Sequence, residues 1–243
     1  MPKYFVTPDS VKENEIIIEG EDAKHIGTVL RAKIGEKLTV CDGYNRDYEC
    51  TIKEIEKTKV TLSIDSSSEC GAEPKIKITL FQALPKADKM ELILQKCTEL
   101  GVCEFVPVAT ERAVVKLDKK DKSAKKTERW QKIAESAAKQ SGRGIIPAVH
   151  EPVSFAEAIK MASLLDGAII PYELEEKNGL REFTADFKGE TLGIFIGPEG
   201  GFAKSEVEAA LSAGFKSITL GKRILRTETA GMAAAAILIY ELG

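Results

Sequence analysis

The sequence predicts an α/β protein of two domains, a small β-barrel domain followed by a larger domain with a largely parallel sheet. In residues 1–72, short runs of alternating or β-branched residues recur with turns at close intervals, which is typical of a barrel. From residue 73 on, apolar strand-like runs alternate with helix patterns, which favours parallel strands joined by crossover helices. A chain of 243 residues has room for one or two ordinary domains.

In the first domain we expect strands at 15–18, 37–41, 48–55 and 60–64, with one helix at 22–30. Residues 42–47 supply a hairpin loop between the second and third strands. The polar segment 66–74 contains Gly71 and Pro74 and reads as a linker. The domain boundary is therefore expected between residues 72 and 73.

In the second domain, Asp88 is placed to cap a helix that runs to Leu100, and Gly101 is placed to end it. The S-x-x-E pattern of a capping box starts at Ser154 and again at Ser205, so two further helices should begin there. The remaining predicted elements are strands at 76–82, 104–108, 168–170, 191–196 and 217–220 and helices at 127–140 and 230–240.

Two glycine-containing loops follow the last two predicted strands, at Gly197-Pro198-Glu199-Gly200-Gly201 and from Gly221 to Thr229. Ligands of open α/β sheets bind at the carboxyl ends of the strands, so these loops suggest a pocket for a flat, polar small molecule. The dinucleotide and triphosphate fingerprints G-x-G-x-x-G and G-x-x-x-x-G-K-[ST] are absent. Glycine loops are also common where no cofactor binds, so spacing alone leaves both interpretations open.

Composition excludes several classes of protein. The longest uncharged apolar stretch, from Ala230 to Tyr240, is shorter than the roughly 20 residues of a membrane span, and the N-terminus has no signal-peptide core. The five cysteines include no C-x-x-C pair, and only His25 and His150 accompany them. We therefore expect a cytoplasmic, metal-free protein with reduced thiols.

Charge is uneven along the chain, with a net charge of −4 in residues 1–72, +6 in residues 73–150 and −5 in residues 151–243. A nucleic acid would thus meet a local basic patch, although the same residues also fit a solvated loop and helix face. The densest cluster is Lys116, Lys119, Lys120, Lys122, Lys125, Lys126, Arg129 and Lys132.

Several of these stretches closely resemble motifs of the RsmE family. They are the Gly-Pro-Glu-Gly-Gly loop, the Leu-Gly-Lys-Arg-Ile-Leu-Arg-Thr-Glu-Thr-Ala run from Leu220, the Gln-Lys-Cys-Thr-Glu-Leu-Gly-Val run from Gln95, His25-x-x-x-Val29-Leu30-Arg31, Glu111-Arg112, Glu128-Arg129-Trp130 and Gln140-Ser141-x-Arg143. Members of that family are SPOUT-class methyltransferases that methylate N3 of a uridine in 16S ribosomal RNA. Because the motifs span nearly the whole chain in the family's order, chance similarity is a poor explanation.

The resemblance implies a PUA-like β-barrel RNA-binding domain followed by a SPOUT α/β trefoil-knot methyltransferase domain, a topology that periodicity could never indicate. It also implies S-adenosyl-L-methionine (SAM) as cofactor, held by three loops whose glycine backbones and apolar side chains suit the ribose and adenine. The cofactor residues carried over are Pro171, Tyr172, Gly197, Glu199, Gly200, Gly201, Leu220, Gly221, Ile224, Leu225 and Arg226.

For catalysis, N3 of uracil must lose its proton at or before transfer, and neither histidine lies in the motif loops. Our hypothesis is that Arg226 orients the uracil or its phosphate, while Glu199 or Glu228 assists with the proton. Purely structural roles for the two carboxylates stay open. By spacing alone, His25 is a packed histidine. The RNA-binding residues that we expect are Arg31, Arg46, Lys86, Arg112, Arg129 and Arg143.

The expected partners are 16S ribosomal RNA in the small subunit and a second copy of the chain. The stretch from Ala233 to Ala236 suits close helix packing in a homodimer, or ordinary packing in the core. Two alternatives remain, a SPOUT methyltransferase acting on another RNA and a non-catalytic dimeric RNA-binding factor. One departure from the family pattern is Ala203, where a helix-capping serine is usual, and the capping role is expected to shift to Ser205.

Overall fold

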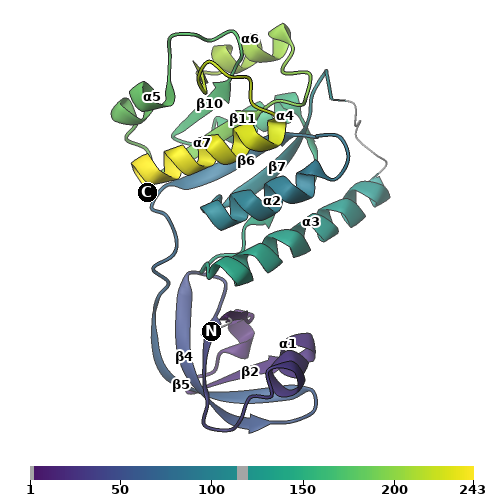
Figure 1. The fold of residues 1–243 in the computed structure, drawn as a ribbon, viewed down its shortest axis with the longest axis vertical. Coiled ribbons are helices and arrows are strands. Elements are labelled where there is room, and N and C mark those ends of the chain that lie inside the picture. Colours follow the sequence, from purple (N-terminus) through teal and green to yellow (C-terminus); the bar gives the residue numbers. More distant parts are fainter. Residues whose placement is uncertain (1–2, 114–119) are drawn as a thin grey trace. The chain divides into compact units, whose positions relative to one another are not determined.

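The computed structural model describes residues 3–113 and 120–243, with the side chains of 120–122 left out (Figure 1). The chain forms two compact units. Unit 1 comprises the residues up to Glu73 together with Ala138–Ile146, and unit 2 comprises Pro74–Ala137 together with Pro147–Gly243. The chain therefore passes between the units at three points. Lys116 and Lys119 of the predicted basic cluster lie outside the described residues.

Unit 1 is built on a 5-stranded sheet in the order β1-β3-β4-β5-β2. The strands are β1 (Lys3–Phe5), β2 (Glu15–Glu19), β3 (Lys37–Cys41), β4 (Arg46–Ile55) and β5 (Lys59–Glu69). β1 pairs with β3 in parallel, and the other pairs are antiparallel. Alternate residues point inward, so Ile16, Ile18, Val60 and Leu62 join one buried core. The predicted strands of the first domain are confirmed, and β3 has the predicted bounds.

Two predictions in this unit are wrong in detail. The linker expected at 66–74 begins later, because Ser66–Glu69 continue β5 and pair with residues 46–49 of β4. The helix expected at 22–30 is α1 (Gly20–Lys24) followed by a π-helical turn, η2 (His25–Val29). A short 3₁₀ turn, η1 (Pro8–Ser10), precedes β2. After η2 the chain turns sharply through Arg31, whose φ of 52° is unusual for a residue with a side chain.

Residues 138–146 belong to unit 1, where the buried carboxylate of Glu73 holds them by hydrogen bonds. Glu73 accepts hydrogen bonds from the guanidinium of Arg143 (Nη2 to Oε2, 2.6 Å) and from the backbone N–H groups of Gly144 and Ile145 (2.8 and 3.1 Å). The backbone of Gly144 also accepts from Asn45 N over 2.9 Å. A Cβ on Gly144 would lie 2.5 Å from Cβ of Cys70, so a side chain cannot be accommodated there.

Unit 2 contains a 7-stranded sheet in the order β12-β10-β11-β6-β7-β8, with β9 also paired to β7. The strands are β6 (Lys77–Ala83), β7 (Glu104–Ala109), β8 (Ala148–Val149), β9 (Val153–Ser154), β10 (Gly167–Pro171), β11 (Thr191–Ile196) and β12 (Lys216–Ile218). Every pairing between these strands is parallel, which confirms the predicted parallel sheet. Parallel strands buried on both faces read as continuous apolar runs, as β11 does.

Helices cover both faces of this sheet (Figure 1). On one face, α2, α3, α5 and α7 bury apolar residues against β6, β10 and β11, and on the other face α4 and α6 do so. The helices are α2 (Lys89–Leu100), α3 (Lys120–Ser141), α4 (Phe155–Ala162), α5 (Leu180–Asp186), α6 (Lys204–Ser212) and α7 (Thr227–Leu242). Within the described residues, no helix has both the length and the apolarity that crossing a membrane requires.

The helix ends show which local predictions hold. Gly101 ends α2 with a left-handed φ of 109°, and Ser154 with Glu157 forms a capping box at the start of α4, so both are confirmed. The capping box predicted from Ser205 is wrong. The N-cap of α6 is Ala203, and Glu206 caps its backbone N–H through Oε2 over 2.9 Å. Glu206 thus makes the glutamate half of a capping box, while Ala203 has no hydroxyl to make the other half.

The cysteines are free thiols. Cys41, Cys50, Cys70 and Cys97 are buried, and Cys103 is partly exposed. Burial raises the pKa of Cys41, Cys50 and Cys97 to about 12. A thiol with so high a pKa is rarely a thiolate, which makes these side chains poor nucleophiles.

Candidate active site

Three loops of unit 2 begin at the same edge of the sheet, after β10, β11 and β12. These three strands are neighbours in parallel register, so their carboxyl ends lie side by side. The backbone of Tyr172, after β10, donates to Ile218 O of β12 over 3.0 Å. A Cβ added to Gly201, after β11, would lie 3.1 Å from the carboxylate of Glu173. The sequence-predicted residues Tyr172 and Gly201 are thereby brought into one region.

The loop after β11 exposes its backbone. Gly201 closes a tight turn by donating to Pro198 O over 2.9 Å, and its φ of 68° favours glycine. Gly200 is exposed, and its carbonyl oxygen accepts from Arg112 Nη1 over 3.1 Å. Because Gly200 and Gly201 have no side chains, a ligand could approach the backbone of this loop closely.

A buried network ties this loop to the start of α7. The hydroxyl of Thr227 donates to Gly197 O over 2.6 Å and accepts from Gln82 Nε2 over 2.9 Å. Gln82 Nε2 also donates to Ala83 O over 3.0 Å, whereas its Oε1 is buried without a partner among the described residues. The hydroxyl of Thr227 has one proton, which it gives to Gly197 O. It can therefore only accept from Gln82, so the amide NH₂ of Gln82 must face it.

The predicted catalytic carboxylates converge on one ammonium. Lys89 Nζ lies 2.9 Å from Glu199 Oε1 and 3.3 Å from Glu228 Oε2. Partial burial alone would raise the pKa of Glu199, but hydrogen bonds from Lys89 Nζ and from backbone N–H groups outweigh it, so the pKa is lowered. A carboxylate held in its charged form accepts a proton less readily, so this ion pair weakens Glu199 as a general base.

The third predicted catalytic residue, Arg226, is the N-cap of α7 and is exposed. In the described part of the chain, no group bonds to its guanidinium. Ile224, two residues earlier, has 91% of its surface exposed, and Leu225 is half-buried. An apolar side chain and a cation thus face solvent together just before α7 begins.

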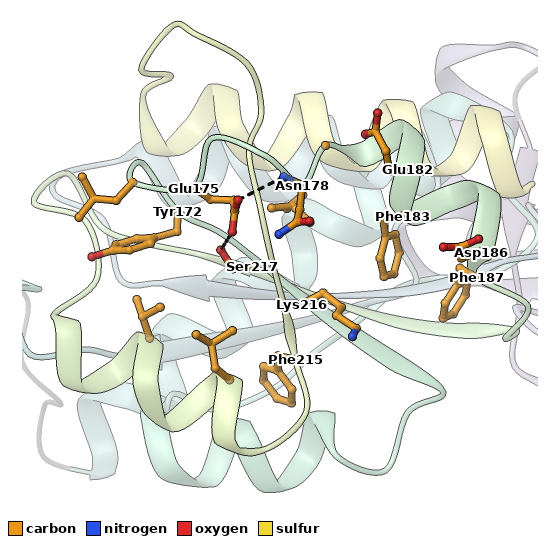
Figure 2. Close-up of a pocket in the computed structure, with 15 residues that line it drawn as sticks. Tyr172, Glu175, Asn178, Glu182, Phe183, Asp186, Phe187, Phe215, Lys216 and Ser217 are labelled. Carbon is orange, nitrogen blue, oxygen red and sulfur yellow. Dashed lines mark hydrogen bonds between the residues drawn. The ribbon is translucent and has the colours of Figure 1, made fainter.

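A cavity of about 800 Å³ lies beside the edge strand β12, between α5 and α6. Figure 2 shows Phe183 of α5 and Phe187, just after this helix, on one side and Phe215 on the other. Among the predicted cofactor residues only Tyr172 lines it, so the cavity is distinct from the glycine loops. Glu175 accepts a hydrogen bond from Ser217 Oγ (2.9 Å) at its wall.

The predicted RNA-binding residues differ in exposure and in the partners that their side chains bind. Arg31 and Arg46 of unit 1 and Lys86 of unit 2 are exposed. Arg112, also exposed, bonds to Gly200, and Arg129 forms an ion pair with Glu91 over 2.6 Å while its side chain stays 67% exposed.

Arg143 does not have the exposed position that a phosphate contact requires. Its side chain is only 3% exposed, and its guanidinium bonds to Glu73. In the sequence, Arg143 follows the end of a predicted helix, and no neighbouring residue indicated that it would be buried in an ion pair with Glu73. We therefore assign Arg143 a role in holding unit 1 together.

The two histidines lie outside the loops. His25 Nδ1 lies 2.9 Å from Tyr4 Oη, in agreement with the expected packed histidine. His150 pairs with Glu104 over 3.5 Å. Among the described residues, no group of three histidine, cysteine or acidic side chains is arranged to hold a metal ion.

Sequence reasoning missed Gln82, Lys89 and Thr227. Gln82 had a visible signal, since it is the polar residue in the apolar end of its strand, Leu80-Phe81-Gln82-Ala83. Thr227 lies between two predicted catalytic residues and could have been suspected for that reason alone. Lys89 carried no signal, because only the fold brings it to Glu199 and Glu228.

Comparison with known proteins extends these observations. Residues 72–239 match the model of an RNA methyltransferase domain, and residues 18–65 match that of an RNA methyltransferase PUA domain. The chain is 37% identical to ribosomal RNA small subunit methyltransferase E of Bacillus subtilis, over 99% of this chain and 97% of that protein. It is 32% identical to the protein of the same name from Aquifex aeolicus, over 93% and 94% of the two chains.

A solved structure agrees with the fold. The crystal structure of ribosomal RNA small subunit methyltransferase E from Neisseria gonorrhoeae, bound to S-adenosyl methionine, superposes with a TM-score of 0.84 at 33% identity. The match covers 98% of this chain and 96% of that one. The predicted fold class, a PUA-like β domain before a SPOUT α/β methyltransferase domain, is confirmed.

Proposed function

Because the chain belongs to the ribosomal RNA small subunit methyltransferase E family, we propose that it transfers a methyl group from SAM to N3 of a uridine in 16S ribosomal RNA. The observation that carries this proposal is the meeting of the β10, β11 and β12 loops at one edge of the sheet, with Arg226 exposed nearby. The relatives named for this activity match along nearly their whole length.

The residues at the loops fit such a methyl donor. Gly200 and Gly201 offer bare backbone for close approach, and Ile224 and Leu225 offer apolar surface for an adenine ring. The nearby carboxylate of Glu173 gives this region negative charge, which suits a cation. We assign the cofactor to Pro171, Tyr172, Gly197, Glu199, Gly200, Gly201, Leu220, Gly221, Ile224, Leu225 and Arg226.

SAM would supply a methyl group bonded to a positively charged sulfur. The sulfur keeps the electron pair of the broken S–C bond as N3 forms its new bond to the methyl carbon. The protein's part is to position the acceptor and to stabilise charge. Arg226, whose guanidinium has no partner among the described residues, can donate to a uracil carbonyl next to N3 as the N–H proton is lost. Glu228 or solvent accepts that proton in this scheme, since Glu228 Oε2 lies farther from Lys89 Nζ (3.3 Å) than Glu199 Oε1 does (2.9 Å).

RNA binding in this proposal uses exposed cations from both units, namely Arg31, Arg46, Lys86, Arg112 and Arg129. The target uridine must be unpaired or flipped out, because N3 is engaged in a Watson–Crick pair. Affinity should fall by about 0.7 log unit per log unit of salt for each single-strand phosphate neutralised. Such a substrate places the enzyme in the cytoplasm.

We also propose that the chain works as a homodimer through the face formed by α2 and α7. Leu92 of α2 and Ile237 of α7 are each 44% exposed, and Tyr240 of α7 is 87% exposed, so these two helices, which contact each other, both carry apolar side chains that a second copy could cover. Ala234 and Ala235 pack in the core, which supports the core-packing alternative for that stretch and leaves the proposed interface to the exposed side chains. Threading of the loops into a trefoil knot stays a prediction.

Mass spectrometry of small-subunit RNA tests the function. A strain that lacks the protein should lose one N3-methyluridine, and the wild-type gene should restore it while Arg226→Ala should not. A methyl group lost from another RNA would favour a SPOUT enzyme of different specificity. Absence of SAM binding in calorimetry, with RNA binding intact, would instead favour a non-catalytic RNA-binding factor.

A further inference from the structure

Lys89, the first residue of α2, bridges two segments that are far apart in the sequence. Its ammonium contacts Glu199 of the loop after β11 (2.9 Å) and Glu228 in the first turn of α7 (3.3 Å). The three side chains are 30%, 28% and 15% exposed, so the cluster lies near the surface without being fully solvated.

The sheet brings these segments together. β6 and β11 are direct neighbours, with Gln82 in register with Ile196, so the loops that follow them start side by side. The backbone N–H of Lys86 also donates to Glu199 Oε1 over 3.2 Å. The loop after β11 is thus held to the loop after β6 as well as to α7.

Lys89 supplies the positive charge between the two carboxylates of Glu199 and Glu228. Glu199 and Glu228 carry like charges, which repel at short range unless a cation lies between them. Arg226 is two residues before Glu228, so the backbone that presents its guanidinium is anchored at Glu228. Without Lys89, repulsion would separate the loop after β11 from the start of α7, and Arg226 would move relative to Gly197 and Gly201.

We propose that Lys89 is a positioning residue for methyl transfer, whose ammonium holds Glu199 and Glu228 together and so fixes Arg226 relative to the cofactor loop. This inference rests on the proposed function. It assigns Lys89 no contact with the substrate, because its ammonium donates to Glu199 and forms an ion pair with Glu228. The effect should therefore fall on turnover rather than on RNA binding.

Steady-state methylation of small-subunit RNA by Lys89→Met, Lys89→Arg and Lys204→Met tests this. Lys204 is a matched control, since its ammonium pairs only along α6 with Glu208 and its side chain is 85% exposed. For Lys89→Met we expect kcat to fall about 100-fold, the scale of a misplaced catalytic group, with KM for RNA unchanged. Lys89→Arg should restore most of kcat, and Lys204→Met should match wild type.

A double-mutant cycle separates positioning from direct action on the substrate. In a Glu199→Gln and Glu228→Gln background the repulsion is gone, so adding Lys89→Met should change kcat less than threefold, whatever activity that background retains. A Lys89→Met effect of equal size in both backgrounds would show that the ammonium acts on the substrate itself, and would overturn the proposal.

The outcomes also separate this inference from the proposed function. If wild type and Lys204→Met methylate the RNA and Lys89→Met does so equally well, the positioning role is wrong and the function stands. If wild type transfers no methyl group to small-subunit RNA, both fail. Circular dichroism checks the fold of each variant, and Lys89→Gln replaces Lys89→Met in the same comparison should the latter not fold.

Discussion

The hydroxyl of Thr227 donates to the carbonyl oxygen of Gly197 over 2.6 Å, inside a site where Thr227 is only 5% exposed. This bond joins the first turn of α7 to the loop after β11 with no solvent between them. Together with the ion pair of Lys89, it makes two attachments between segments that are 30 residues apart in the chain.

Replacing Thr227 by valine keeps the shape and removes the hydroxyl. Gly197 O and Gln82 Nε2 then lose a buried partner, which costs about 1–3 kcal/mol. Urea denaturation should show this loss, and SAM affinity should fall as well because the loop after β11 loosens. Thr227→Ser keeps the hydroxyl and should stay within about 1 kcal/mol of wild type. Equal stability of the valine and serine variants would show that the bond contributes nothing.

The buried pair of Glu73 and Arg143 is predicted to hold unit 1 together. Arg143→Met leaves a carboxylate buried with backbone partners alone, so the free energy of unfolding should fall by about 3–5 kcal/mol. Arg129→Met, which removes an exposed partner from Glu91, should cost about 0–1 kcal/mol. Thermal unfolding of both variants checks the difference, and similar losses would contradict the structural role assigned to Arg143.

The carboxylate of Glu175 should make stability depend on pH in acid. Hydrogen bonds from the backbone of Lys177, from Ser217 Oγ and from the backbone of Asn178 lower its pKa from 4.5 to about 2. Because the folded-state pKa is depressed, the stabilisation is fully present above pH 4.5 and is lost as the pH falls toward about 2.

The measurement is the Tm of wild type and of Glu175→Gln between pH 7 and the acid limit of folding. Wild type should melt higher at pH 7, and the gap should close as the pH falls below 4.5. Glu176→Gln, at the exposed carboxylate next to it, serves as control and should change Tm little at pH 7. A gap as large at pH 3 as at pH 7 would mean that the carboxylate's hydrogen bonds are not its source.

Gly201→Ala should impair SAM binding more than it impairs folding. The substitution strains a backbone with φ of 68° and pushes a methyl group to 3.1 Å from Glu173. Gly214→Ala is the matched control, because its φ of 89° is similarly strained but nothing lies within 4 Å. Both should lose roughly 1–2 kcal/mol of stability. Calorimetry should find weaker SAM binding for Gly201→Ala alone, and equal affinities would remove Gly201 from the cofactor site.

Sequence patterns correctly predicted the helices and strands that neighbouring residues along the chain determine. β3 and β11 have the bounds expected from their apolar runs, and Gly101 and Ser154 end and begin their helices as their chemistry dictates. The short helix α5 was missed because Gly179 provides no capping side chain before Leu180. At α6, the helix begins two residues before Ser205, with Ala203 as N-cap and Glu206 accepting from its backbone N–H.

The site was harder to predict, because its contacts join distant segments. The identity of the glycine loops pointed to the cofactor region and to Arg226, but no pattern along the chain relates Lys89 to Glu228, 139 residues later. Arg143 shows the opposite error. Its motif suggested RNA, while its burial depends on Glu73, which the sequence placed in a linker.

The most direct test of the account is single-turnover methylation of small-subunit RNA with labelled SAM, comparing wild type with Arg226→Ala. We expect wild type to label one uridine at N3, and the variant to transfer no methyl group even at a SAM concentration that saturates it. A variant that methylates at the wild-type rate would contradict the assignment of Arg226. A wild-type protein that labels no uridine would contradict the function itself.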